Sequence, residues 1–125
     1  MLPFKVQFVQ GEPVYEQVLF AAKKAIVRGQ LKPGDPFPSV RVLSQELRIN
    51  PNTAQKVSAH LRAEGLIEVK PGLGSIVSGS SQVLKSQKNE LLGRELERLV
   101  VEAKKLKLSE EDLLESVREH WENLS

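Results

Sequence analysis

The feature that most constrains the fold is a polar helix pattern that begins at Asn50. Asn50 can cap a helix through its side-chain oxygen, and Pro51 suits the first helical position, where a missing N–H costs nothing. Three apolar residues then fall on one face at helical spacing: Ala54, Val57 and Leu61. The opposite face carries three polar side chains: Asn52, Gln55 and Lys56. The pattern predicts a helix with one buried face and one hydrogen-bonding face.

The polar face of this helix suits the edges of DNA bases. Asn and Gln side chains match the edge of adenine, whereas Lys suits guanine or a phosphate. An ordinary amphipathic surface helix has the same pattern, so residues 50–61 alone leave both interpretations open. The neighbouring segments must decide between them.

A scaffold helix is predicted ahead of this segment, from about Pro13 to Arg28, and Gly29 is placed to end it. Its apolar stripe consists of Val14, Val18, Ala22, Ala25 and Ile26. Before it, residues 4–8 alternate apolar and polar side chains, which indicates a short strand or an extended arm packed on one side.

A second short helix is predicted from about Val40 to Arg48, with Ser39 as its N-cap. Three prolines and a Pro-Gly pair within residues 31–38 exclude a helix just before it. Its buried face consists of Val40, Leu43 and Leu47. Only a short break separates it from the helix that begins at Asn50, so the two form a helix-turn-helix pattern.

A β-hairpin is predicted after the third helix, which ends at Gly65. Residues 66–70 and 75–78 are rich in β-forming side chains, and a Pro-Gly-Leu-Gly turn separates them. A hairpin directly after a recognition helix is a wing. The glycine-rich tip is not a phosphate-binding loop, because such loops precede a helix and a strand follows here.

Residues 79–81 are small and polar and are the predicted hinge, which divides the chain into residues 1–79 and residues 80–125. From Gln82 the chain is predicted to be helical again, with a leucine-rich stripe over some 25 residues that Gly93 weakens without breaking. A last helix begins after Ser109, where Asp112 occupies the capping-box position three residues on.

These last two helices are too small to bury both of their apolar stripes between themselves. The same pair from a second chain is the favoured cover, which predicts a homodimer with a four-helix interface, and packing back onto the winged domain is the alternative. The predicted dimerisation residues are Leu84, Leu91, Leu92, Leu96, Leu99, Val100, Leu106, Leu113, Leu114, Val117 and Trp121.

Composition narrows the functional classes. The chain has 125 residues, a net charge of +2 and no cysteine, which excludes disulfides and thiolate metal ligands. Residues 1–80 carry ten basic against six acidic side chains, and residues 81–125 carry eight against ten, so the mildly basic part contains the helix-turn-helix pattern. Without an apolar run long enough to span a bilayer or a signal peptide, the chain is predicted to be cytoplasmic, with no membrane partner.

Catalysis is not predicted. The two histidines, His60 and His120, lie in different segments with no cysteine or acid-rich site beside them, and His60 is expected on a helix face near DNA or solvent. The acidic residues 110–112 are explained by the positive end of a helix dipole. The sequence therefore predicts no enzyme, no catalytic residue, no metal site and no cofactor, and it identifies no effector.

Residues 13–79 resemble the DNA-binding domain of GntR-family bacterial transcription regulators. The resemblance rests on the ordered motifs Leu-Lys-Pro-Gly-Asp at 31–35, Pro-Ser-Val-Arg at 38–41, Glu-Gly-Leu at 64–66 and Gly-Leu-Gly at 72–74. The short tail and the Asn-Pro-Asn-Thr turn at 50–53 are similar to the YtrA-type subfamily, whose members typically repress operons that often encode ABC transporters.

The resemblance implies a mainly α-helical winged helix-turn-helix domain followed by a two-helix dimerisation tail, with double-stranded DNA as the partner. The predicted DNA-binding residues are Arg41, Asn50, Asn52, Thr53, Gln55, Lys56, Lys70 and Gly72. Pro51 and Gln55 replace arginines found in many members, so the base preference need not follow theirs. Ser75 and Phe37 replace the usual Thr and Leu, and the tail is too small to enclose an effector pocket.

Two functional hypotheses follow from the sequence. The leading one is a homodimeric, sequence-specific repressor on a pseudo-palindromic operator, with the recognition helices in major grooves and Arg41, Lys56 and Lys70 on phosphates. The alternative is a winged-helix adaptor that binds protein. An adaptor has the same fold, but it does not need exposed Asn52, Gln55 and Lys56 together.

Overall fold

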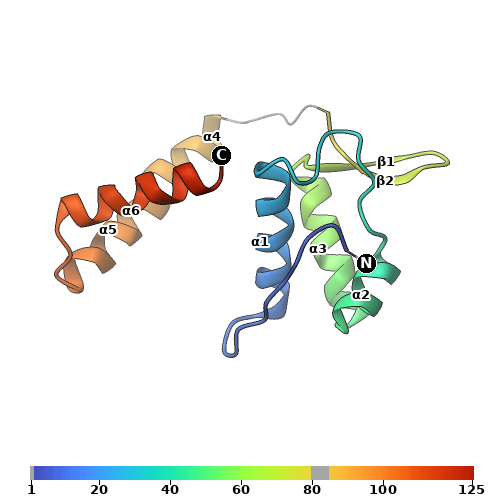
Figure 1. The fold of residues 1–125 in the computed structure, drawn as a ribbon, viewed down its shortest axis with the longest axis horizontal. Coiled ribbons are helices and arrows are strands. Elements are labelled where there is room, and N and C mark those ends of the chain that lie inside the picture. The colour runs from blue at the N-terminus through green and yellow to red at the C-terminus, as the bar shows by residue number, and fades with distance from the viewer. Residues whose placement is uncertain (1, 80–84) are drawn as a thin grey trace. The chain divides into compact units, whose positions relative to one another are not determined.

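The computed structural model describes residues 2–79 and 85–125. The chain forms two compact units, Met1–Ser81 and Gln82–Ser125 (Figure 1). Part of the predicted hinge, Ser80 and Ser81, lies outside the described residues, as do the predicted helix start at Gln82 and the predicted dimerisation residue Leu84.

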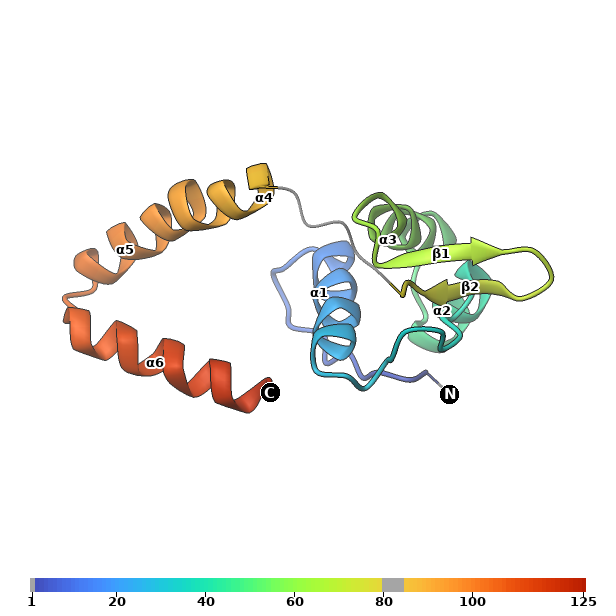
Figure 2. The ribbon, with the colours of Figure 1, turned by 90° about the horizontal axis from the view of Figure 1, so that it is seen from above.

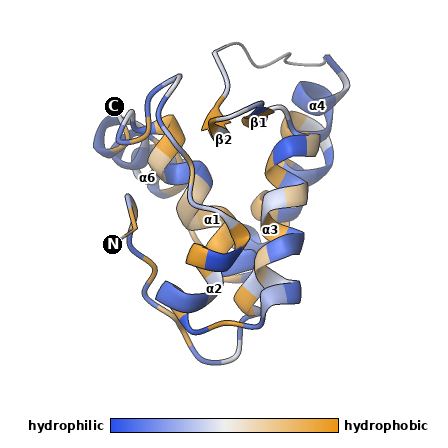
Figure 3. Cartoon of the chain, turned by 90° about the vertical axis from the view of Figure 1, so that its right-hand side faces the viewer, coloured by the Kyte–Doolittle hydropathy of each residue, from blue (hydrophilic) through white to orange (hydrophobic). Residues whose placement is uncertain are grey.

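The helices of the first unit are α1 (Val14–Val27), α2 (Val40–Leu47) and α3 (Pro51–Ala63), which confirms the predicted helices to within a few residues. The stripe of α1 differs from the prediction in part. Leu19 is buried, whereas Val14 in the first turn remains 41% exposed. Hydrophobic and hydrophilic segments alternate along these helices (Figure 3), as expected for helices with one buried face.

The core of the first unit lies where α1, α2 and α3 meet beneath the wing (Figure 2). Its central side chains on α3 have no exposed area, and neither do Val18 of α1 and Leu43 of α2. The buried core residues are Phe4, Val18, Leu19, Ala22, Ala25, Leu31, Phe37, Leu43, Ala54, Val57, Leu61, Ile67 and Val77.

Side-chain caps begin α2 and α3 as predicted. The Ser39 hydroxyl accepts a hydrogen bond from the Val42 amide at 3.2 Å, and the Asn50 side-chain oxygen accepts one from the Asn52 amide at 2.8 Å. Each cap satisfies one backbone donor that the helix itself leaves unpaired.

The turn between α2 and α3 depends on a left-handed residue that is not glycine. Arg48 has φ 54°, and the Ile49 amide donates to the Ser44 carbonyl at 3.1 Å, which closes α2 in a Schellman-type end. Gly65 plays the corresponding part after α3, with φ 75°, as the sequence predicted. Only Arg48, Ile49 and Asn50 separate the end of α2 from the start of α3.

The wing is an antiparallel hairpin of β1 (Ile67–Lys70) and β2 (Gly74–Val77), in which Ile67 pairs with Val77 and Lys70 with Gly74. At its tip the Leu73 amide donates to the Lys70 carbonyl at 3.0 Å, and Gly72 has φ 81°. Proline followed by glycine at positive φ is the pattern of a type II turn. The predicted hairpin is therefore confirmed.

The proline-rich segment before α2 forms a second Lys-Pro-Gly turn and joins the wing. The Asp35 amide donates to the Lys32 carbonyl at 2.9 Å, with Gly34 at φ 90°. The next residues pair with β2, since the Val77 amide donates to Asp35 and the Phe37 amide donates to Ser75, both at 2.9 Å. The sequence predicted the break in helix here but not this pairing.

The N-terminal residues form an extended arm without a regular strand. Phe4 is buried, and its ring stacks on Phe37 with the ring centres 6.0 Å apart. Of the two predicted possibilities, the arm is the one observed.

The second unit contains α4 (Lys85–Glu90), a π-helical turn at Leu91–Glu95, α5 (Leu96–Lys105) and α6 (Glu110–Asn123). The helix continues through Gly93, as predicted, but it does so as a π turn centred on that residue. Glycine lowers the preference for regular helix, and π turns occur as single-turn bulges in α-helices.

Two local motifs shape the end of the second unit. Lys107 has φ 60°, and the Leu108 amide donates to the Ala103 carbonyl at 2.9 Å, so α5 also closes in a Schellman-type end. The capping box at α6 is complete: the Ser109 amide donates to the Asp112 carboxylate, and the Asp112 amide donates to the Ser109 hydroxyl, both at 3.0 Å.

No helix in residues 2–79 or 85–125 is both long and apolar enough to cross a bilayer.

The Asn50 cap yields a stability prediction. Replacing Asn50 with Ala removes the acceptor for the Asn52 amide, so we expect a loss of about 0.5–2 kcal/mol in the free energy of unfolding. Asn50→Ser keeps a capping oxygen and should lose little. Chemical denaturation of both variants measures the difference, and equal stability of the two would contradict the capping role.

The capping box yields a pH prediction. Hydrogen bonds from the Ser109 amide, and then from its hydroxyl, lower the pKa of Asp112 below 3.8. Because the folded-state pKa is depressed, the stabilisation is present above the ordinary pKa and is lost as the pH falls through the lowered one. NMR titration of the carboxyl should place its midpoint below 3.8. Ser109→Ala, which removes the hydroxyl, should raise that midpoint, and an unchanged midpoint would contradict the assignment.

Candidate nucleic-acid interface

The outward face of α3 is the centre of the candidate site. Ala54, Val57 and Leu61 have no exposed area and fix which side of the helix faces the core. Four residues at helical spacing are exposed on the other side: Asn52, Gln55, Lys56 and Ala59. The predicted division of this helix into a buried and an exposed face is confirmed. The small Ala59 leaves the middle of the exposed face without a bulky side chain.

The other predicted site residues at the start of α3 are less free than the sequence suggested. The side-chain oxygen of Asn50 already accepts a hydrogen bond from the Asn52 amide, so one lone pair of that oxygen and the amide nitrogen remain for a ligand. Thr53 is half-buried at the edge of the exposed face. Asn52 and Gln55 are thus the amide side chains best placed for contacts in a groove.

The remaining predicted contacts lie on α2 and on the wing. Arg41 is exposed in the first turn of α2, and Lys70 and Gly72 are exposed on the hairpin. Lys70 forms an ion pair with Glu68 at 3.6 Å between two half-exposed side chains, an interaction of little energetic weight. Leu73 at the wing tip is 73% exposed, which sequence reasoning did not single out.

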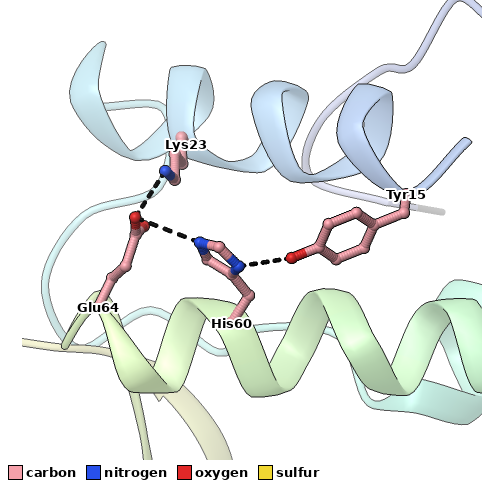
Figure 4. Close-up of polar contacts among 4 residues, drawn as sticks. All are labelled: Tyr15, Lys23, His60 and Glu64. Atoms are coloured by element: carbon pink, nitrogen blue, oxygen red, sulfur yellow. Dashed lines mark hydrogen bonds and ion pairs between the residues drawn. The ribbon is translucent and has the colours of Figure 1, made fainter. Parts of the chain in front are cut away.

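Beside this face, a polar cluster joins α1 to α3 (Figure 4). The Tyr15 hydroxyl and His60 Nδ1 share a hydrogen bond, and His60 Nε2 lies 3.3 Å from Glu64 Oε1. Lys23 Nζ of α1 reaches the same carboxylate oxygen at 2.8 Å. His60 lies on a face of α3 with 39% of its side chain exposed, and its ring is held by contacts with both α1 and α3, which the sequence did not predict.

Lys56 extends from the exposed face to the ring of Tyr15. Its ammonium nitrogen lies 4.6 Å from the ring centre, within the range of a cation–π interaction. Sequence reasoning assigned Lys56 to phosphate or guanine and did not connect it with α1. The only local signal was the four-residue spacing of Lys56, His60 and Glu64, which places them on one side of α3.

The site chemistry is that of recognition. The exposed amides supply donors and acceptors, the cations supply charge, and the wing backbone can approach a ligand closely at Gly72. Within the described ranges, no group of three His, Asp or Glu side chains is arranged to hold a metal ion.

Comparisons with known proteins agree with this geometry. Residues 14–77 match the family model "Bacterial regulatory proteins, gntR family", which spans the three helices and the wing. The chain is 31% identical over 112 residues to YhcF of Bacillus subtilis, an uncharacterized HTH-type transcriptional regulator, covering 90% of this chain and 93% of the relative. It is 34% identical over 108 residues to the HTH-type transcriptional repressor YtrA of the same organism, covering 86% and 83%.

Solved structures share the fold over nearly the whole chain. A GntR-family transcriptional regulator from Listeria monocytogenes has a TM-score of 0.66 at 27% identity and covers 90% of this chain and 98% of its own. A structure described as a transcriptional antiterminator from Listeria monocytogenes has a TM-score of 0.82 at 24% identity, covering 97% and 91%, and supports the fold alone. The chain therefore belongs to the GntR family of DNA-binding bacterial transcription regulators and has its winged helix-turn-helix fold.

Proposed function

We propose that this regulator is a homodimeric repressor that binds a pseudo-palindromic operator, with residues 1–79 contacting DNA and residues 80–125 holding two chains together. The observation that carries the proposal is the outward face of α3, where Asn52, Gln55 and Lys56 are exposed beside a buried apolar face. The repressor name of the YtrA relative supports the direction of regulation.

The proposed DNA contacts divide into base readers and phosphate contacts. Asn52 and Gln55 lie in the first two turns of α3, the part of a recognition helix that reaches base edges in the major groove. Arg41, Lys56 and Lys70 supply cations from α2, α3 and β1, and such contacts fix register without reading sequence. The wing backbone at Gly72 follows the adjacent minor groove in this proposal.

The proposed dimer follows from apolar surface on the second unit. Within its described residues Ala103 is the only buried hydrophobic residue, while Leu92 is 68% and Trp121 is 78% exposed. Val100 and Leu113 are partly covered, so they contribute less to an intermolecular surface than the sequence suggested. Exposed apolar side chains of this kind are characteristic of protein interfaces, and a second copy offers the same set of side chains.

A winged-helix adaptor that binds protein remains the second candidate. It needs an exposed surface on the first unit but no particular pattern of amides and cations on α3. Sequence-specific DNA binding that depends on Gln55 separates the two functions.

The base-reading face is tested with labelled DNA from the region upstream of the gene. Gln55→Ala should weaken binding to the preferred site by about 1–3 kcal/mol and relax the preference at one base position. Lys56→Ala should weaken all sequences alike and reduce the slope of log affinity against log salt by about one. Titrations by fluorescence anisotropy at several salt concentrations measure both effects.

Lys32→Ala is the matched control for these variants, because Lys32 is an exposed cation outside the proposed contacts. It should leave both the base preference and the salt slope unchanged. If both Gln55→Ala and Lys56→Ala bind DNA as the wild type does, the exposed face of α3 is not the surface that contacts the DNA bases.

The dimer is tested by sedimentation equilibrium on paired variants of α5. Leu99→Glu places a charge on the apolar stripe and should raise the dimer dissociation constant at least about tenfold. Val101→Glu is the control, because Val101 follows Leu99 by two residues and therefore points about 200° away from it around the helix. Val101 is also exposed, at 57%, so the same charge can be introduced there. A monomeric wild-type protein, or equal effects of the two variants, would contradict the proposed interface.

A further inference from the structure

The ammonium group of Lys56, on the exposed face of α3, contacts the ring of Tyr15 on α1. Lys56 is exposed and its ammonium group lies 4.6 Å from the ring centre of Tyr15, a half-buried residue of α1. A ring can occupy only one side of an ammonium group that has three N–H donors. The donors that point away from Tyr15 stay available to an anion.

The ring of Tyr15 is itself fixed through its hydroxyl. His60 Nδ1 is its hydrogen-bond partner, and the imidazole is oriented in turn by the Glu64 carboxylate at 3.3 Å (Figure 4). Nδ1 faces the tyrosine hydroxyl and Nε2 faces the carboxylate, so both ring nitrogens of His60 have a polar partner.

A second contact with α1 holds Glu64, the last residue in this series of contacts. Lys23 Nζ donates to Glu64 Oε1 at 2.8 Å, so Glu64 receives one contact from each helix. Tyr15 and Lys23 are two turns apart on α1, and Lys56 and Glu64 are two turns apart on α3. The contacts therefore run along the α1–α3 interface rather than crossing it at one point.

We infer that Tyr15 is a positioning residue for DNA binding, whose ring holds the Lys56 ammonium group in place for a phosphate contact. This inference rests on the proposed function. A lysine side chain that is free in solution loses rotamer entropy when DNA orders it, whereas one already held against a ring loses less. The hydroxyl bond to His60 keeps the ring from turning away.

A double-mutant cycle on operator binding tests the inference. The four proteins are the wild type, Tyr15→Leu, Lys56→Ala and the double variant, each assayed by fluorescence anisotropy below its own thermal unfolding transition. Tyr15→Leu should weaken operator binding by about two- to fivefold in the wild-type background and cause no further loss in the Lys56→Ala background. Tyr15→Phe keeps the ring but removes its hydrogen bond to His60, so its affinity should lie between those of the wild type and Tyr15→Leu.

The outcomes separate a positioning role from a purely structural one. An equal loss from Tyr15→Leu in both backgrounds would show that the residue acts only through the fold, and tighter binding would show that the ring withholds Lys56 from DNA. Either result, or no effect of Tyr15→Leu, overturns the inference while the proposed function stands. A wild-type protein that does not prefer operator over unrelated DNA of equal length overturns both.

Discussion

The fold of the first unit is organised around the buried face of α3. Ala54, Val57 and Leu61 are completely removed from solvent by α1 and α2, so rotation of the helix about its axis would expose apolar surface. The polar side of the helix is therefore directed outward by the core and not by its own contacts. The packing of three short helices thus fixes which side chains of α3 face solvent.

The wing depends on the same core through its buried ends. Ile67 and Val77 pair with each other and belong to the core cluster, so the base of the hairpin is fixed while its tip extends into solvent. Residues 35–37, which precede α2 in the sequence, add backbone hydrogen bonds to β2, which follows α3. The two Lys-Pro-Gly turns make both connections short, because proline and glycine preset the required backbone angles.

The elements predicted from the sequence were those with a local physical signal. The caps at Ser39 and Asn50, the buried face of α3 and the Pro-Gly tip of the hairpin were predicted correctly. Features that tertiary structure imposes had no such signal. Arg48 takes a left-handed conformation that sequence reasoning assigns to glycine, and the contacts of Tyr15 with Lys56 and His60 join residues about 40 positions apart.

The proposed DNA-binding surface is the outward face of α3, with support from α2 and the wing. NMR titration of isotope-labelled protein with its upstream operator can locate this surface, because backbone amides report contacts residue by residue. We expect the largest shifts at residues 39–42, 50–56 and 70–74, with much smaller shifts in α6. Shifts concentrated in the second unit, with α3 unaffected, would contradict the proposal.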